Sequence, residues 1–215
     1  MRRMLLEKTG SAIWMSHLDL MRLMQRAFRR AGVLLHHSQG FTPHAYVSML
    51  LPLSVGVESA CEIMEYELDT ELTVTPEALN KVLPQGVRVL QVYESMRKAK
   101  ELVYLQAELT LEYDAGVPQN AAQRIAELLC GEALIVEKRT KRGNMEIDIR
   151  PMLKSCKIVS QEKALRVCCT VSAQNPSLNP LLLVSAIERY LPQDHPDFAK
   201  CRRIAVLDAD GERFQ

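Results

Sequence analysis

Residues 16–32, SHLDLMRLMQRAFRRAG, predict an amphipathic helix that begins at Ser16 and stops at Gly32. At about 100° per residue, its apolar side chains fall on one face and its arginines on the opposite face. The apolar set is Leu20, Leu23, Met24, Ala27, Phe28 and Ala31, and the basic set is Arg22, Arg26, Arg29 and Arg30. The apolar face is expected to lie against a core, and the arginines face outward.

Strand-like segments lie on both sides of this helix. In the first half, strands are predicted at residues 2–8, 45–51, 62–68 and 86–94, with a short helix from Thr75 to about Val82. The alternation in 62–68 places Met64, Tyr66 and Leu68 inward and Ile63, Glu65 and Glu67 outward. The resulting order of elements is β-α-β-β-α-β.

The second half repeats this order after a linker at 97–101. The segment 102–113, LVYLQAELTLEY, alternates with period two and predicts a strand. Further elements are a helix from Pro118 to about Cys130, hairpins at 133–138/145–149 and 155–160/164–172, a helix from Asn179 to about Tyr190, and a strand at 202–207. The predicted fold class is α+β, with two tandem ferredoxin-like (βαββαβ) domains at 1–96 and 101–215, the second with an extra hairpin.

Composition excludes several classes of protein. The 215 residues are 47% hydrophobic and 25% charged, which is typical of folded globular chains. No apolar run is long enough for a membrane helix, and the apolar stretch in the first ten residues is too short for a signal peptide. We therefore expect a cytoplasmic protein without a membrane partner. The motifs of P-loop, dinucleotide, hydrolase and iron–sulfur sites are absent from the sequence, and no cofactor is expected.

The six cysteines include no C-x-x-C pair, so we expect reduced and mostly buried thiols rather than a metal site. Cys168 and Cys169 are adjacent on a predicted strand and therefore face opposite sides of it.

Charge is distributed unevenly along the chain. Residues 1–60 carry seven basic and three acidic side chains, residues 61–135 carry six and 13, and residues 136–166 carry nine and four. Two basic blocks therefore flank an acidic one, although the net charge is only +1. Local fields of this kind steer a phosphate-bearing partner.

The arginines of the 16–32 helix have two interpretations. The first is an ordinary solvated face. The second is a surface for a polyanion, which is supported because no Asp or Glu follows any of these arginines at i+4.

The start of the same helix carries Ser16, His17 and Asp19. Ser16 and Asp19 match the spacing of a helix cap, so Asp19 is explained by capping alone. His17 and Asp19 are nevertheless candidates for catalysis or metal binding, together with His44.

Residues 36–44, HHSQGFTPH, form a loop with three histidines. Gly40 and Pro43 indicate a turn, and Ser38 and His44 offer polar groups for phosphate or a small ligand. Phe41 is either a core residue, the favoured interpretation, or an exposed platform for stacking a base.

A second basic segment, residues 138–144, predicts a hairpin tip with a Gly143-Asn144 turn. Its cations are Lys138, Arg139, Lys141 and Arg142. The tip is either a solubilising turn or a finger for a nucleic-acid groove. Beyond it, Asp148 and Arg150 are predicted on one face of a strand, and Arg150 joins the nucleic-acid-binding candidates.

The segments SHLDLMRLMQRAFRRAG (16–32), HSQGFTPHAYVSMLLPLSVGVES (37–59), KRTKRG (138–143) and IDIRP (147–151) resemble the DUF2344 family of uncharacterised bacterial proteins, described as radical SAM-linked. The resemblance implies a radical SAM protein as partner and a link to ribosomal genes. The positions that it marks as a candidate surface are His17, Asp19, Arg22, Arg26, Arg29, Arg30, Ser38, Gly40, Phe41, Pro43 and His44.

Three functions follow as hypotheses. The favoured one is a non-catalytic RNA-binding or substrate-presenting accessory protein for a radical SAM enzyme acting on RNA or a ribosomal component. The second is a small enzyme acting on RNA through His17 or His44, with or without a metal. The third is a protein-protein adaptor that uses the acidic strand face of Glu65 and Glu67.

Overall fold

The computed structural model describes residues 1–69, 73–140 and 143–215, which divide into two compact units. Unit 1 comprises Met1–Glu101 together with Gln215, and unit 2 comprises Leu102–Phe214. Both combine antiparallel strands with a few helices, which confirms the predicted α+β class. Within the described part of the chain, no helix is long and apolar enough to span a membrane.

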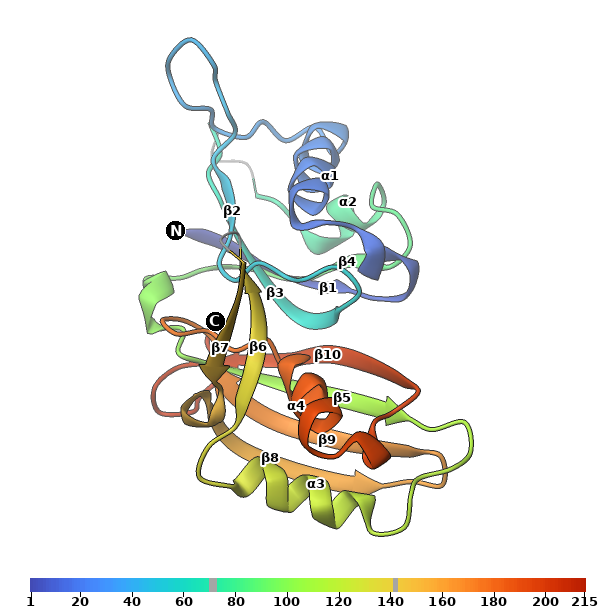
Figure 1. The fold of residues 1–215 in the computed structure, drawn as a ribbon. Coiled ribbons are helices and arrows are strands. Elements are labelled where there is room, and N and C mark those ends of the chain that lie inside the picture. The colour runs from blue at the N-terminus through green and yellow to red at the C-terminus, as the bar shows by residue number, and fades with distance from the viewer. Residues whose placement is uncertain (70–72, 141–142) are drawn as a thin grey trace. The chain divides into compact units, whose positions relative to one another are not determined.

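Unit 1 follows the predicted order of elements (Figure 1). Its elements are β1 (Arg2–Lys8), η1 (Gly10–Trp14), α1 (His17–Arg30), β2 (Val47–Met49), β3 (Glu58–Tyr66), α2 (Pro76–Asn80), β4 (Val87–Glu94) and η2 (Ala99–Glu101), where η denotes a 3₁₀ helix. β1 pairs with β3 and with β4, and β2 pairs with β3, all antiparallel.

The core of unit 1 lies between one face of this sheet and the two helices. Leu20, Met24 and Phe28 of α1 pack in one cluster with Met4 of β1 and Met64 of β3. Phe28 and Tyr66 are also in ring contact, with centroids 5.0 Å apart. Because the apolar face of α1 is committed to the sheet, its arginine face is turned outward.

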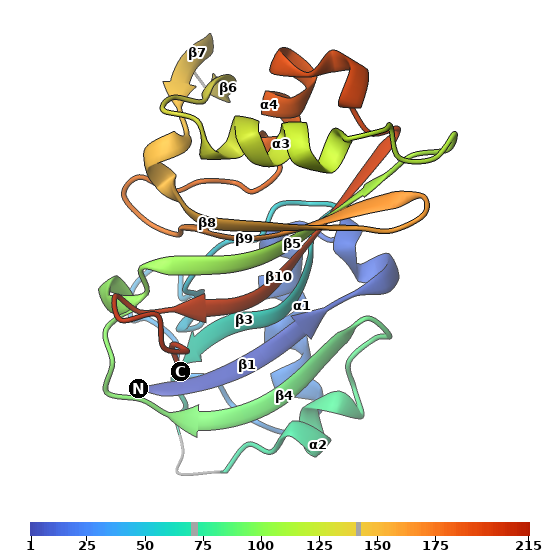
Figure 2. The same ribbon diagram turned by 90° about the horizontal axis from the view of Figure 1, so that it is seen from below.

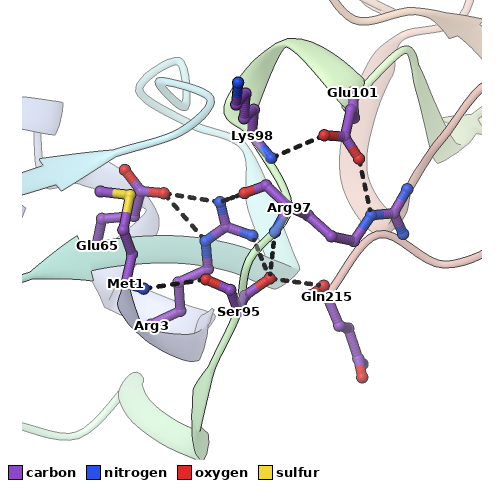
Figure 3. Close-up of polar contacts among 8 residues, drawn as sticks. All are labelled: Met1, Arg3, Glu65, Ser95, Arg97, Lys98, Glu101 and Gln215. Atoms are coloured by element: carbon purple, nitrogen blue, oxygen red, sulfur yellow. Dashed lines mark hydrogen bonds and ion pairs between the residues drawn. The ribbon is translucent and has the colours of Figure 1, made fainter.

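The opposite face of the same strands holds a buried charge, Arg3 (Figure 3). Its Nε and Nη2 donate to Glu65 Oε1 at 3.0 and 2.7 Å, and its Nη1 donates to Ser95 Oγ at 2.9 Å. Nη2 also donates to the backbone carbonyl of Arg97. The guanidinium therefore joins β1, β3 and the segment that follows β4.

The predicted alternation in β3 is kept, with Met64 and Tyr66 in the core beneath the helices, but two expectations about exposure are wrong. The Glu65 side chain is only 13% exposed because it receives Arg3 from the neighbouring strand, so it does not form an acidic outer face. Ile63, also predicted outward, is buried. Glu67 remains exposed.

Unit 2 contains one hairpin more than unit 1. Its elements are β5 (Tyr104–Glu112), α3 (Ala121–Cys130), β6 (Ile135–Thr140), β7 (Gly143–Asp148), η3 (Arg150–Met152), β8 (Leu153–Ser160), β9 (Ala164–Ser172), α4 (Leu182–Tyr190), η4 (Pro192–Asp194) and β10 (Phe198–Leu207). The strands β10, β5, β9 and β8 pair in that order, all antiparallel, and β6 pairs with β7 in a separate ribbon. Figure 2 shows α3 and α4 on the same side of the larger sheet.

The start of α3 differs from the prediction. The helix was expected at Pro118 but begins at Ala121. Asn120 adopts a left-handed conformation with φ 61°, which is incompatible with a right-handed helix, so the preceding residues form a turn instead.

Replacing Arg3 with Met is expected to lower the free energy of unfolding by about 3–5 kcal/mol, because the substitution leaves the Glu65 carboxylate without its buried partner. The matched control is Arg88→Ala on β4, an exposed arginine whose loss is expected to cost no more than about 0.5 kcal/mol. Urea unfolding of both variants measures the difference. Equal stabilities would contradict a structural role for the Arg3–Glu65 pair.

Candidate nucleic-acid interface

The four arginines of α1 are exposed but differ in their partners. Arg22 Nη1 lies 3.2 Å from Asp19 Oδ1. A search for acids four residues after each arginine overlooks this pair, because Asp19 precedes Arg22 by three residues and compensates its charge. The other three, Arg26, Arg29 and Arg30, make no ion pair within residues 1–69, 73–140 and 143–215, and we call them the arginine row.

The helix cap predicted at Ser16 is confirmed. The Asp19 N–H donates to Ser16 Oγ at 3.2 Å, and the Ser16 hydroxyl donates to the Asp19 carboxylate at 2.6 Å. The hydrogen bond from Ser16, reinforced by Arg22, holds the pKa of Asp19 below its ordinary value. Asp19 is therefore an ionised carboxylate at neutral pH, and its contacts are those of a helix start.

Residues 36–46, which we call the finger, form a small hairpin that projects beyond α1 and β2 (Figure 1). His37 and Ala45 make an antiparallel bridge. On either side of it, the Ser38 N–H donates to the His44 carbonyl at 2.9 Å and the Tyr46 N–H donates to the His36 carbonyl at 2.8 Å. The predicted loop is therefore an ordered two-stranded element rather than a simple turn.

The finger ends in an exposed phenylalanine. Phe41 has a relative accessibility of 111%, so its ring contacts almost nothing, and the favoured interpretation of Phe41 as a core residue is wrong. The reason is geometric: the hairpin carries its tip away from the sheet, and Gly40 turns the chain there at φ +134°. An unburied phenylalanine forgoes roughly 1.5–3 kcal/mol of hydrophobic stabilisation.

One face of the finger carries three rings, His36, Tyr46 and His44, which we call the aromatic face. The His36 and Tyr46 rings stack at 5.2 Å with 23° between their planes, and His44 lies 6.0 Å from Tyr46. Ser38 fixes His44 through a 2.8 Å contact between its Oγ and the imidazole Nδ1. His36 and Tyr46 were not identified from the sequence as parts of this face. The available signals were the i, i+2 spacing of His44 and Tyr46, which places both on one side of a strand, and the pairing of residues across a hairpin.

A pocket of about 280 Å³ lies between α1 and the finger. Its lining includes Gln25 and Arg29 from α1, and His37, Pro43 and His44 from the finger. The structure therefore brings Arg29 of the arginine row beside the finger, although the two are separate segments of the sequence.

The sequence profile of the family described as "Uncharacterized protein conserved in bacteria (DUF2344)" matches residues 2–180. The chain belongs to the DUF2344 family. The resemblance seen in the helix and loop segments is thereby confirmed. No curated protein matches the chain.

The chain of this DUF2344 protein also matches chains of solved structures. A chain in the crystal structure of a Cbf5-Nop10-Gar1 complex matches 95% of the protein at 10% identity, with a TM-score of 0.51. A chain in the archaeal box H/ACA sRNP Nop10-Cbf5 complex matches 94% at 10% identity, with a TM-score of 0.48. The matches cover 48% and 46% of those chains, so the protein spans about half their length. At this identity the likeness concerns the fold alone.

The second basic segment, residues 138–144, does not present a row of exposed cations among the described residues. Lys138 is partly buried in β6, and Arg139 lies in the same strand. Lys141 and Arg142 lie outside the described residues. The predicted Gly143-Asn144 turn is wrong, because both residues belong to β7, where they pair with β6.

Arg150 is a structural residue rather than a free cation. It begins the 3₁₀ helix η3 instead of extending a strand, and its Nε and Nη1 donate to the carbonyls of Gly131 and Leu153, each at 2.9 Å. Asp148 accepts the Leu134 and Arg150 N–H groups at 2.8 and 3.0 Å, which turns the chain after β7. Two nitrogens of the guanidinium that the sequence-based prediction assigned to nucleic acid are therefore bound to the backbone.

The three candidates for catalysis or metal binding are divided between two elements. His17 and Asp19 belong to the first turn of α1, and His44 belongs to the finger. In the described part of the chain, no three His, Cys, Asp or Glu side chains are close enough to hold a metal ion.

The six cysteines are free thiols, but only Cys61, Cys169 and Cys201 are buried. Burial raises the pKa of Cys169 and of Cys201 to about 12. Cys130 and Cys168 are exposed, so the expectation of mostly buried thiols is too broad. The predicted opposite orientation of Cys168 and Cys169 is confirmed.

Iodoacetamide at mildly alkaline pH is expected to label Cys130 and Cys168 first, because alkylation requires an accessible thiolate. Cys169 and Cys201 are expected to stay unlabelled until the chain is unfolded. Mass spectrometry of native and urea-treated protein checks the order, and rapid native labelling of Cys169 would contradict its burial.

Proposed function

We propose that this DUF2344 protein is a non-catalytic RNA-binding accessory protein that presents RNA or a ribosomal component to a radical SAM enzyme. The observation that supports RNA binding is the arginine row: three exposed guanidinium groups on one rigid helix, unpaired within the described residues. Guanidinium groups bind phosphates bidentately, and a phosphate chain relieves the mutual repulsion of neighbouring arginines. The radical SAM partner rests on the family resemblance.

The scaffold proposed for this function is a pair of ferredoxin-like units. In unit 1 the pairing of β1 with β3 and β4, and of β3 with β2, supports this topology. In unit 2 the order β10-β5-β9-β8 supports it as well, with β6 and β7 as an insertion before β8.

The adaptor alternative has lost part of its basis. It required an acidic face on β3, but Glu65 is bound to Arg3, and only Glu67 of the two carboxylates remains exposed. The arginine row is therefore the stronger basis for a binding function.

Replacing all three residues of the arginine row with Ser is expected to weaken binding of a short unstructured RNA and of heparin. If each arginine contacts one phosphate, the slope of log Kobs against log salt becomes shallower by about two, at ~0.7 per contact on a single strand. Fluorescence titrations over a salt series measure the slope. The matched control removes three exposed arginines elsewhere, Arg88, Arg202 and Arg213. Unchanged RNA affinity in the arginine-row variant would overturn the proposed function.

Asp19→Asn is expected to tighten RNA binding by roughly two- to five-fold, the range of one exposed charge pair, because it releases Arg22 and removes a negative charge beside the row. Asn keeps an oxygen for the Ser16 hydroxyl, so the helix cap is preserved. The same titration measures the effect. Loss of binding in this variant would instead mean that the Asp19 carboxylate itself contacts the ligand.

A further inference from the structure

We propose that the finger binds unpaired bases of RNA by stacking them on Phe41 and on the aromatic face, while the arginine row holds the phosphates. This inference rests on the proposed function and adds the class of RNA, which is single-stranded rather than duplex.

The ring surfaces needed for stacking are present and accessible. Phe41 is fully exposed at the tip, and Tyr46 is 44% exposed farther down the finger. His36 already lies nearly parallel to Tyr46, and Ser38 holds His44 in place beside it. Rings held in this way lose little freedom when a base is added, and base–aromatic stacking tolerates any sequence because every base has a π-face.

The geometry of nucleic acids explains why the bases must be unpaired. Inside a duplex, both faces of each base are covered by its neighbours, so a ring at the tip of a hairpin has no base face to contact. In a single strand the bases splay outward and stack on aromatic side chains. Phe41 is therefore a contact that a duplex cannot use.

The two sides of the finger carry different charges, so one side suits the phosphates of RNA and the other suits its bases. The pocket beside α1 includes Arg29 and has no carboxylate in its described lining, so it accepts phosphate. On the side of the aromatic face, a pocket of about 190 Å³ is lined by His44, Tyr46 and Glu67, among others, and Asp69 is bound to His36. Carboxylates repel phosphate but accept hydrogen bonds from the amino groups of bases. The RNA backbone therefore follows α1, and its bases turn toward the finger.

The test compares Phe41→Ala with Phe198→Ala in the full chain. Phe198 is 54% exposed at the start of β10 and is the matched control for loss of one exposed phenylalanine. Each protein is titrated with a short unstructured RNA, with the same strand annealed to its complement, and with heparin, which has charge but no bases.

The unmodified protein is expected to bind the single strand more tightly than the duplex. Phe41→Ala is expected to weaken single-strand binding roughly tenfold, within the range for one stacked base, and to leave heparin binding and thermal unfolding unchanged. Phe198→Ala is expected to match the unmodified protein throughout.

Two results overturn the stacking proposal: preference of the unmodified protein for the duplex, or equal single-strand affinity in Phe41→Ala. Either result leaves the arginine row intact as a phosphate site. The proposed function fails separately if the arginine-row variant keeps full RNA affinity, and both fail if the unmodified protein binds no RNA.

Discussion

The buried guanidinium of Arg3 is the interaction on which the arrangement of unit 1 depends. It lies opposite Glu65 in the pairing of β1 with β3, and it also binds Ser95 beyond β4. A buried charge is tolerated only with its partners in place, so this network specifies which strands are neighbours and in which register. It also occupies the carboxylate that would otherwise give β3 an acidic outer face.

The position of the candidate interface follows from that register. Once Met4 and Met64 face the helices, Leu20, Met24 and Phe28 hold α1 against the sheet and the arginine row must point outward. The finger begins just after α1 and returns directly into β2, so it is anchored at both ends by elements of the same core. Charge and exposed rings are thereby presented together on a rigid support, which is the combination used for single-stranded nucleic acid.

The contrast between the arginine row and Arg150 illustrates how the structure separates residues of the same type. Among the described residues, the side chains of the arginine row make no hydrogen bond to a backbone carbonyl. Arg150, in contrast, lies where the chain turns after β7, and its guanidinium donates to the carbonyls of Gly131 and Leu153. One kind of arginine is left for a ligand, and the other holds the fold.

Sequence by itself determined the family, through segments spread along the chain, and the features that depend on neighbours within a few residues: the helix within 16–32 with its Ser16 cap and the strand within 102–113. These follow from periodicity and from short-range hydrogen bonds, which the order of residues specifies directly. Only the tertiary structure decided that Arg3 meets Glu65, that Phe41 is exposed and that Arg29 lies beside the finger. Burial and long-range pairing depend on strand register and on the direction in which a hairpin leaves the sheet, and neither is encoded in local spacing.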